Sequence, residues 1–382
     1  MNHTEIHAIV IGSIHHNTLG VVRSLGEASI PIENLQVVIV GSEVNVKNII
    51  STSKYVLTEN MYYVDGYGDI VPFLMDNPRF KADSVLICCS DGASEAVMNA
   101  KEVLCAKYRT PQLLSDASKM MVKSEQNSVA AECGLNVPIS GDFSVQEEID
   151  WDVFPCIIKP YKSVAGAGKA DIHIIHSKEE LATVWQSLQA DAIQIQQYIE
   201  KEMEFQLIGC SLDGGKNILI PGFTKILRQP KNTNTGYLLY SPITDLEYDR
   251  ESVEKFIQKI GYSGLFSVEF IRGKDGKDYF LEINMRNDGN AYCVKSAGVN
   301  LPYIWTYYQT YGTMPNAPIS FVTPIYFIPD FNDLKIALKH ESVFKWLKEF
   351  KNAQSHSIYN KSDMRPFKFE FFRQVKRIIK RH

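Results

Sequence analysis

The chain has 382 residues, of which 45% are hydrophobic and 22% are charged. These values are typical of a soluble globular protein with two or three domains. The net charge of −4 gives no general reason to expect a nucleic-acid partner.

The seven cysteines are scattered and form no C-x-x-C pair, which argues against a zinc knuckle and against a disulfide framework. The apolar run at residues 6–12 is too short for a signal peptide and has no basic segment before it. No apolar run reaches transmembrane length. We therefore expect a cytoplasmic protein with reduced thiols.

Residues 1–112 alternate short apolar runs with helical patterns. HAIVIGS, LQVVIVGS and DSVLICCS are typical of buried strands, and their alternation with helices predicts a parallel α/β domain. His15 and His16 follow the first run, and Asp91 and Glu95 follow DSVLICCS, so they would face the crevice where open α/β sheets bind ligands. Alternatively, the histidines are plain surface residues and Asp91 caps the next helix.

Residues 113–195 begin with a helical pattern that ends near Gly134 and Pro138. The strand FPCIIKP, a glycine-bearing loop and a second strand follow, and then a further helix. Two common phosphate-binding patterns do not fit the glycines of this chain. A Walker loop needs Ser or Thr after its lysine and a helix beyond, but Lys169 is followed by alanine and a strand. The second pattern, a dinucleotide fingerprint, would lie after the first strand of the chain. It needs a tight glycine triplet, but only Gly12 and Gly20 occur there.

The third interpretation is a loop between antiparallel strands that folds over a nucleotide. Gly166 and Gly168 would let backbone N–H groups approach phosphate oxygens. Lys159, at the end of the preceding strand, would supply a point charge for those phosphates. A simple hairpin with a mobile tip is the alternative.

Residues 264–284 contain two β-rich runs around an Asp-Gly turn signal at 275–276. If these two residues form the loop, Glu269 lies directly opposite Glu282. Carboxylates roughly 5 Å apart on one sheet face would repel by about 3 kcal/mol at an effective dielectric constant near 20. The hairpin therefore requires a cation close to the two acids.

Glu282, Asn284 and Arg286 alternate along the second run and therefore share one face of a strand. The Glu-x12-Glu-x-Asn-x-Arg hairpin, the IIKP strand with its glycine loop and the QQYI…EMEF run resemble the ATP-grasp superfamily. The similarity is to its carboxylate–amine ligases, such as D-alanine–D-alanine ligase and D-aspartate ligase. Biotin carboxylase and carbamoyl phosphate synthetase are relatives. The resemblance covers residues 6–310.

This resemblance implies a mixed α/β and α+β architecture. The parallel α/β domain of residues 1–112 would be the pre-ATP-grasp domain of such enzymes. A two-lobed ATP-grasp fold would follow, with the small lobe at residues 113–195 and the large lobe at 196–330. Residues 331–382 would form a helical, basic C-terminal extension.

The resemblance also implies a metal site. Glu269, Glu282 and Asn284 would hold Mg²⁺, with Mn²⁺ as an alternative, bridging the phosphates of ATP. This would be the cation that the hairpin requires. Arg286 would stabilise charge on the transferring phosphoryl group and on the tetrahedral intermediate.

Further positions match the nucleotide contacts of the superfamily. Lys159 and Lys123 match its two lysines near the phosphates. Backbone groups of Gln197 and Ile199 would contact the adenine edge, although the superfamily usually has Glu where Gln196 or Gln197 aligns. Glu204 would contact the ribose hydroxyls.

Each of these residues has a structural alternative. Lys123 would be a solvated lysine, Glu204 an exposed strand residue, and Arg286 an ion-pair partner of Glu269 and Glu282. A buried acid pair without a metal is costly, and the motifs occur together, so we favour the functional interpretation.

The C-terminal residues 367–382 form an amphipathic pattern. Phe371, Phe372, Val375, Ile378 and Ile379 fall on one helical face, opposite a basic face. Such a helix can lie on an anionic membrane surface. The alternative, which we favour from sequence, is a terminal helix that packs its apolar stripe onto the body.

We expect an ATP-dependent ligase that joins a carboxylate to an amine through an acyl phosphate and releases ADP and phosphate. Its partners would be small-molecule carboxylates and amines, with no nucleic acid. One alternative is carboxylation through carboxyphosphate, and another is a regulatory protein that binds ATP without turnover. A dinucleotide-dependent oxidoreductase is a more distant alternative.

Overall fold

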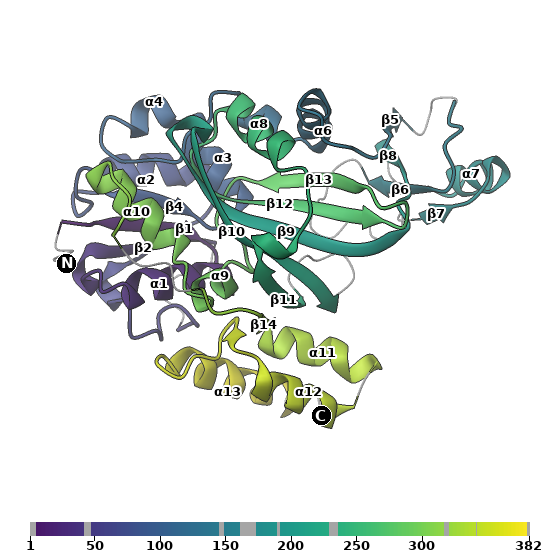
Figure 1. Ribbon diagram of the computed structural model, residues 1–382. Helices are drawn as coiled ribbons and strands as arrows, with labels where there is room; N and C mark the ends of the chain where they lie inside the picture. Colours follow the sequence, from purple (N-terminus) through teal and green to yellow (C-terminus); the bar gives the residue numbers. More distant parts are fainter. Residues whose placement is uncertain are drawn as a thin grey trace.

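The computed structural model describes residues 5–41, 47–144, 149–160, 173–188, 192–228, 236–316, 321–340 and 342–379. Its strands form three sheets with helices packed around them, and a group of helices lies beside the large sheet at the C-terminal end (Figure 1). The predicted fold class is confirmed: a parallel α/β layer comes first, and two antiparallel lobes and a helical extension follow.

The N-terminal sheet is parallel because its strands are joined by helical crossovers. The central strand β1 is buried at every position, as expected for a parallel strand covered on both faces. The strand order is β3 (Met61–Val64), β2 (Leu35–Val40), β1 (Ala8–Gly12) and β4 (Val85–Cys88). The helical segments are α1 (His16–Glu27), η1 (Ile32–Asn34), η2 (Thr58–Asn60), η3 (Tyr67–Asp69), α2 (Ile70–Asp76), α3 (Asp91–Asn99) and α4 (Lys101–Leu104).

The large sheet has seven strands and is antiparallel except where β15 joins β14. Its order is β13 (Asp278–Asn284), β12 (Gly264–Gly273), β9 (Lys201–Leu212), β10 (Asn217–Arg228), β11 (Tyr237–Pro242), β14 (Ile325–Ile328) and β15 (Ser355–His356). Its associated helices are α5 (Ala117–Met120), α6 (Lys123–Glu132), η5 (Asp213–Gly215), η6 (Ile243–Asp245), α8 (Arg250–Ile260), α9 (Tyr292–Ser296) and α10 (Leu301–Tyr311).

The small sheet projects from one end of the large sheet, together with helix α7 (Figure 1). Its order is β5 (Ser140–Ser144), β8 (Ala192–Gln197), β6 (Cys156–Pro160) and β7 (His173–Ile175), and α7 spans Lys178–Trp185. The predicted strands on either side of the glycine loop are therefore present as β6 and β7, paired antiparallel. The loop itself, with Gly166 and Gly168, lies outside the described residues.

The C-terminal helices are α11 (Asp330–His340), α12 (Val343–Asn352) and α13 (Arg365–Ile379). An aromatic cluster joins them: the ring of Phe367 on α13 stacks on Phe331 of α11, at 5.2 Å between centroids, and contacts Phe350 of α12 at 6.1 Å. A buried core also joins the N-terminal layer to the large sheet, with Val10, Ile208 and Trp305 among its members. Within the described part of the chain, no helix is long and apolar enough to cross a membrane.

Candidate active site

The β12–β13 hairpin places the two acids as predicted. Glu269 is the cross-strand partner of Glu282, and Ser267 is the partner of Asn284. Gln206 on the next strand, β9, lies opposite Glu269. A polar row therefore crosses three neighbouring strands of the large sheet.

The turn that joins these strands differs from the predicted two-residue loop. The pairing nearest the turn is Arg272 with Asp278, and β12 ends at Gly273, so the loop covers residues 274–277. This pairing is displaced by one residue from the register that an Asp-Gly loop would give. A bulge that leaves Leu281 unpaired restores the predicted register before Glu282 is reached.

Glu269 is buried and accepts hydrogen bonds from two neutral amides. Gln206 Nε2 donates to its Oε1 at 3.0 Å, and Asn284 Nδ2 donates to the same oxygen at 2.8 Å. These donors stabilise the carboxylate without adding charge. The cation that the hairpin requires therefore lies beside the other acid, Glu282.

Glu282 forms an ion pair with Lys123, at 2.5 Å between Oε2 and Nζ. Lys123 is the first residue of α6. Its side chain is 61% exposed, whereas that of Glu282 is 18% exposed. Partial desolvation by the surrounding groups opposes the lysine charge, but the carboxylate of Glu282, with Glu269 nearby, outweighs this effect and raises the pKa of Lys123. Lys123 is therefore solvent-exposed, as the sequence alternative expected, but it is also paired with Glu282.

Helix α6 is held against β13 by the side chain of Gln126. Its Nε2 donates to the backbone oxygen of Ile283 at 3.2 Å, and its Oε1 accepts from the Ile283 N–H at 2.9 Å. β13 is the edge strand of the sheet, so Gln126 satisfies backbone groups that the ladder leaves unpaired. This contact places Lys123 beside Glu282.

Arg286 does not pair with Glu269 or Glu282, contrary to the structural alternative for this residue. It bonds to Asp91 at 2.9 Å, to Asp288 at 3.2 Å and to the Asn284 side-chain oxygen at 2.9 Å. Burial disfavours its charge, but Asp91 and then Asp288 outweigh burial and raise the pKa of Arg286.

Asp91 therefore connects the N-terminal layer to the hairpin site. The alternative that it caps its helix is wrong, because Ser90 is the N-cap of α3 and accepts from the Ala93 N–H. Asp91 follows Ser90 in the first turn of that helix, where a carboxylate is favoured.

The two predicted histidines differ from each other. His15 is exposed and caps α1 by accepting the Asn17 N–H at Nδ1, at 3.3 Å. His16 is buried, so the surface alternative is wrong for it. Its Nε2 has no hydrogen-bond partner among the described residues. Burial, and then the neighbouring His15, lower the pKa of His16 well below 6.5.

The predicted nucleotide contacts are only partly described. Lys159 pairs through its backbone with Gln194 in the small sheet. The Gln197 N–H donates to the Ile139 carbonyl at 2.7 Å, so this donor is already used within the sheet. Glu204 on β9 forms an ion pair with Lys201 at 2.7 Å. Ile199 lies in the segment between β8 and β9.

Sequence reasoning missed three buried polar residues at this site, namely Gln206, Asp288 and Asn290. Asn290 Nδ2 donates to Gln206 Oε1 at 2.7 Å, and Ser267 Oγ donates to Asp288 Oδ2 at 2.9 Å. The run of polar residues directly after Arg286 is the signal that could have indicated Asp288 and Asn290. The position of Gln206 depends on the register between β9 and β12, which no local pattern specifies.

The donor set suits a hard cation. No group of three or more His, Cys, Asp and Glu side chains that could hold a metal occurs among the described residues. Glu269 and Glu282 are only two carboxylates, accompanied by the amide of Asn284. Mg²⁺ fits such a set because it takes few protein ligands and completes its coordination with phosphate and water.

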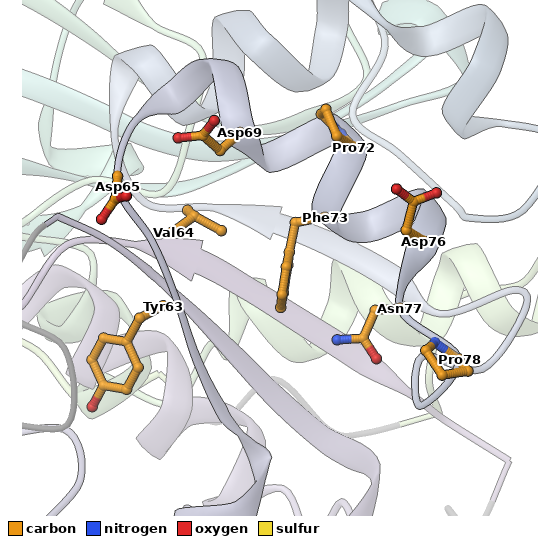
Figure 2. Close-up of a pocket in the computed structure, with 9 residues that line it drawn as sticks. All are labelled: Tyr63, Val64, Asp65, Asp69, Pro72, Phe73, Asp76, Asn77 and Pro78. Carbon is orange, nitrogen blue, oxygen red and sulfur yellow. The ribbon is translucent and has the colours of Figure 1, made fainter.

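A cavity of about 720 Å³ lies elsewhere, on the N-terminal layer beside β3 and α2. Figure 2 shows Phe73 in the middle of the lining residues, with the carboxylates of Asp65, Asp69 and Asp76 around it. None of the residues that line it belongs to the hairpin, to α3 or to α6. We therefore place the candidate active site at the hairpin.

Comparisons with known proteins show which sequences and folds the chain resembles. No family model matches the chain. It is 24% identical to the biotin carboxylase of Nostoc sp. over 259 residues, which cover 64% of this chain and 52% of that protein. The chain thus spans about half the length of this curated relative.

Two solved structures have the same fold. The L-amino acid ligase of Bacillus licheniformis has a TM-score of 0.58 at 15% identity, over 80% of this chain and 74% of that one. The biotin carboxylase domain of Hydrogenobacter thermophilus 2-oxoglutarate carboxylase, in complex with MgADP, ADP and bicarbonate, has a TM-score of 0.60 at 18% identity. That match covers 83% of this chain and 73% of the other. The predicted ATP-grasp fold is therefore confirmed.

Proposed function

We propose that this protein is an ATP-dependent ligase that joins a carboxylate to an amine and releases ADP and phosphate. The observation that carries the proposal is the cluster of Glu269, Glu282 and Asn284 in an ATP-grasp fold. Lys123 is bound to Glu282, and Arg286 is bound to Asn284. A protein that only bound ATP would not need two opposed acids held beside two cations.

Glu269, Glu282 and Asn284 would hold Mg²⁺, which when bound neutralises phosphate charge. Lys123 would leave Glu282 for the phosphates, because a divalent cation at Glu282 replaces the charge that the lysine provides now. Arg286 is already held by Asp91 and Asp288, so it would meet the transferring phosphoryl group without reorganising. Positioning and charge neutralisation are what phosphoryl transfer requires of a protein.

The proposal is tested by assaying ADP release with panels of amino acids and other carboxylates, supplied in pairs with amines. We expect Mg²⁺-dependent formation of ADP and phosphate that is strongly stimulated only when both partners are present. Formation of AMP and pyrophosphate would overturn the proposal, because adenylation transfers a different part of ATP.

A second candidate is carboxylation through carboxyphosphate. The similarity to a biotin carboxylase over 259 residues favours it. This reaction predicts ATP hydrolysis that depends on bicarbonate and is not stimulated by an amine and a carboxylate together. The same assay, run in carbonate-free buffer with and without added bicarbonate, separates the two reactions.

The proposed substrates are small-molecule carboxylates and amines, and the proposed location is the cytoplasm. All seven cysteines are free thiols, which supports a reducing compartment. We also propose that α13 contacts a membrane surface. Phe371 and Phe372, which were expected to pack onto the body, are instead exposed.

A further inference from the structure

The C-terminal extension, residues 331–382, has a charge opposite to that of the rest of the chain. It contains thirteen Lys and Arg against five Asp and Glu, a net charge of +8. Residues 1–330 therefore carry a net charge of −12. A protein whose two parts carry opposite net charges is oriented by the electric field of a charged surface.

The acids of the extension do not weaken its positive surface. Four of the five lie among the described residues, and each is engaged by an arginine. The pairs are Arg228 with Asp333 and Glu349, Arg23 with Asp363, and Arg373 with Glu370. The outward charge of the described extension is therefore almost entirely that of its lysines and of Arg365 and Arg377.

The extension also exposes large apolar side chains. Among the described residues, every phenylalanine that is largely exposed lies here: Phe344, Phe371 and Phe372. On α13, Phe372 is 60% exposed and Ile379 is 67% exposed. Contrary to the separation of faces expected from the sequence, helical spacing places both side chains beside Lys368 and Lys376. Apolar and cationic groups therefore share the outward face of this helix.

A groove of about 570 Å³ runs between α13 and residues 47–52. Its cationic lining includes Lys47, Arg365, Lys368 and Lys376, and none of these four forms an ion pair with a described residue. The first turn of α13 contains no acid, so the positive end of the helix dipole adds to their field. The remaining lining residues are Ser51, Thr52, Phe369, Phe372 and Arg373.

We propose that this groove binds the phosphate headgroup of an anionic phospholipid, while Phe372 and Ile379 insert into the membrane interface beside it. The proposal rests on the membrane contact proposed above for α13 and names its binding site and lipid class. Charge complementarity selects an anionic surface, and exposed aromatic and aliphatic side chains next to the cations select a lipid over a soluble anion.

The experiment compares full-length variants for co-sedimentation with phosphatidylcholine vesicles that contain or lack phosphatidylglycerol. The groove variant combines Lys47→Glu, Lys368→Glu and Lys376→Glu. Its matched control, Lys178→Glu with Lys216→Glu and Lys255→Glu, makes the same charge change at exposed lysines of the body. A second pair compares Phe372→Ser/Ile379→Ser with Val103→Ser/Val322→Ser, which are also exposed apolar positions. Thermal melting shows that each variant is folded.

We expect the parent and both controls to bind the anionic vesicles alone, with binding weakened at high salt. The groove variant should lose at least about tenfold in partition coefficient, and the Phe372/Ile379 variant should lose severalfold. Equal loss in the lysine control would mean diffuse attraction and would overturn the groove assignment, while the membrane contact would stand. If the parent does not bind vesicles, both the groove assignment and the membrane contact are overturned.

Two further outcomes would also overturn the proposal. Inorganic phosphate that protects the groove from lysine acetylation, without any vesicle binding, would assign the groove to a soluble anion. Binding of an RNA oligonucleotide that is lost in the groove variant would assign it to nucleic acid. ADP release, measured without vesicles, should equal that of the parent in every variant, so failure of the ligase proposal is detected separately.

Discussion

Glu282 forms an ion pair with Lys123 in this structure, and it would bind a metal ion in the working enzyme. The Glu282→Gln variant keeps size and hydrogen bonding but removes the charge. Turnover should fall by about two orders of magnitude or more, as expected when one charge-stabilising group is lost. Without metal, the variant loses the Lys123 pair and also the repulsion from Glu269. Because Lys123 is largely exposed, its pair contributes little.

We therefore expect the free energy of unfolding in EDTA to change by less than about 1 kcal/mol, measured by urea denaturation. Mg²⁺ and ATP should stabilise the parent and stabilise the variant much less. The control is Glu125→Gln, at an exposed position on α6, the helix that carries Lys123. This variant should keep full turnover. A large stability loss in EDTA would show that Glu282 serves the fold before it serves the metal.

His16 makes stability depend on pH. Its folded pKa lies below the unfolded value of 6.5, so folding favours the neutral ring. The stability that this contributes is complete above pH 6.5 and is lost as the pH falls toward the folded pKa. We expect the melting temperature of the parent to drop between about pH 7 and pH 5, and that of His16→Asn to drop less. His176→Asn, at an exposed histidine, should follow the parent, and identical slopes for all three proteins would refute this assignment.

At the level of elements, the β12–β13 hairpin shows why the strand pairing at the candidate site could be predicted from sequence. The alternation of Glu282, Asn284 and Arg286 defined a shared face, and the cross-strand partners were correct. The turn was wrong by one residue, and the correct register was obtained only because a bulge compensates. The Lys123–Glu282 pair could not be derived locally, since it depends on how α6 docks beside β13.

Helix α13 shows the opposite outcome. Its sequence pattern favoured burial of Phe371, Phe372 and Ile379, yet Phe372 and Ile379 are largely exposed, and Phe371 is only partly covered by its contact with Phe331 of α11. The helix packs instead through Pro366, Phe367 and Glu370. Helical periodicity identifies an apolar face, but it does not say which surface that face meets.

Gln126 makes the position of α6 testable. Gln126→Ala leaves the N–H and the carbonyl of Ile283 without their side-chain partner in a buried setting. We expect a loss of about 1–3 kcal/mol in the free energy of unfolding, and a lower ADP-release rate because α6 no longer holds Lys123 where it would reach the phosphates. Ser128→Ala, on the exposed side of α6, should change neither quantity. A Gln126→Ala protein with unchanged stability would show that α6 is held by apolar packing alone.

At the level of the whole molecule, a buried ion pair joins the two ends of the chain. Arg23 on α1 bonds to Asp363 before α13 at 3.0 Å, and both side chains are 0% exposed. Asp363 also accepts from Ser53 Oγ and from the Lys54 N–H. The C-terminal extension is thus bound to the N-terminal layer as well as to the large sheet through β15.

Asp363→Asn should cost about 3 kcal/mol or more, because it leaves the charge of Arg23 buried and uncompensated. Asp83→Asn breaks an exposed pair with Arg109 and should cost less than about 1 kcal/mol. Urea denaturation of both variants measures the difference. Equal losses would mean that Arg23 is reached by water in solution.

The same pair constrains how the protein is made. Arg23 and Asp363 are 340 positions apart, and at typical translation rates roughly 20 to 70 s pass between their synthesis. During that interval α1 cannot bury Arg23 without leaving a charge unpaired in the core. The N-terminal layer therefore completes its packing only after residue 363 has been added, so a product that ends before this residue would expose its N-terminal layer to proteases.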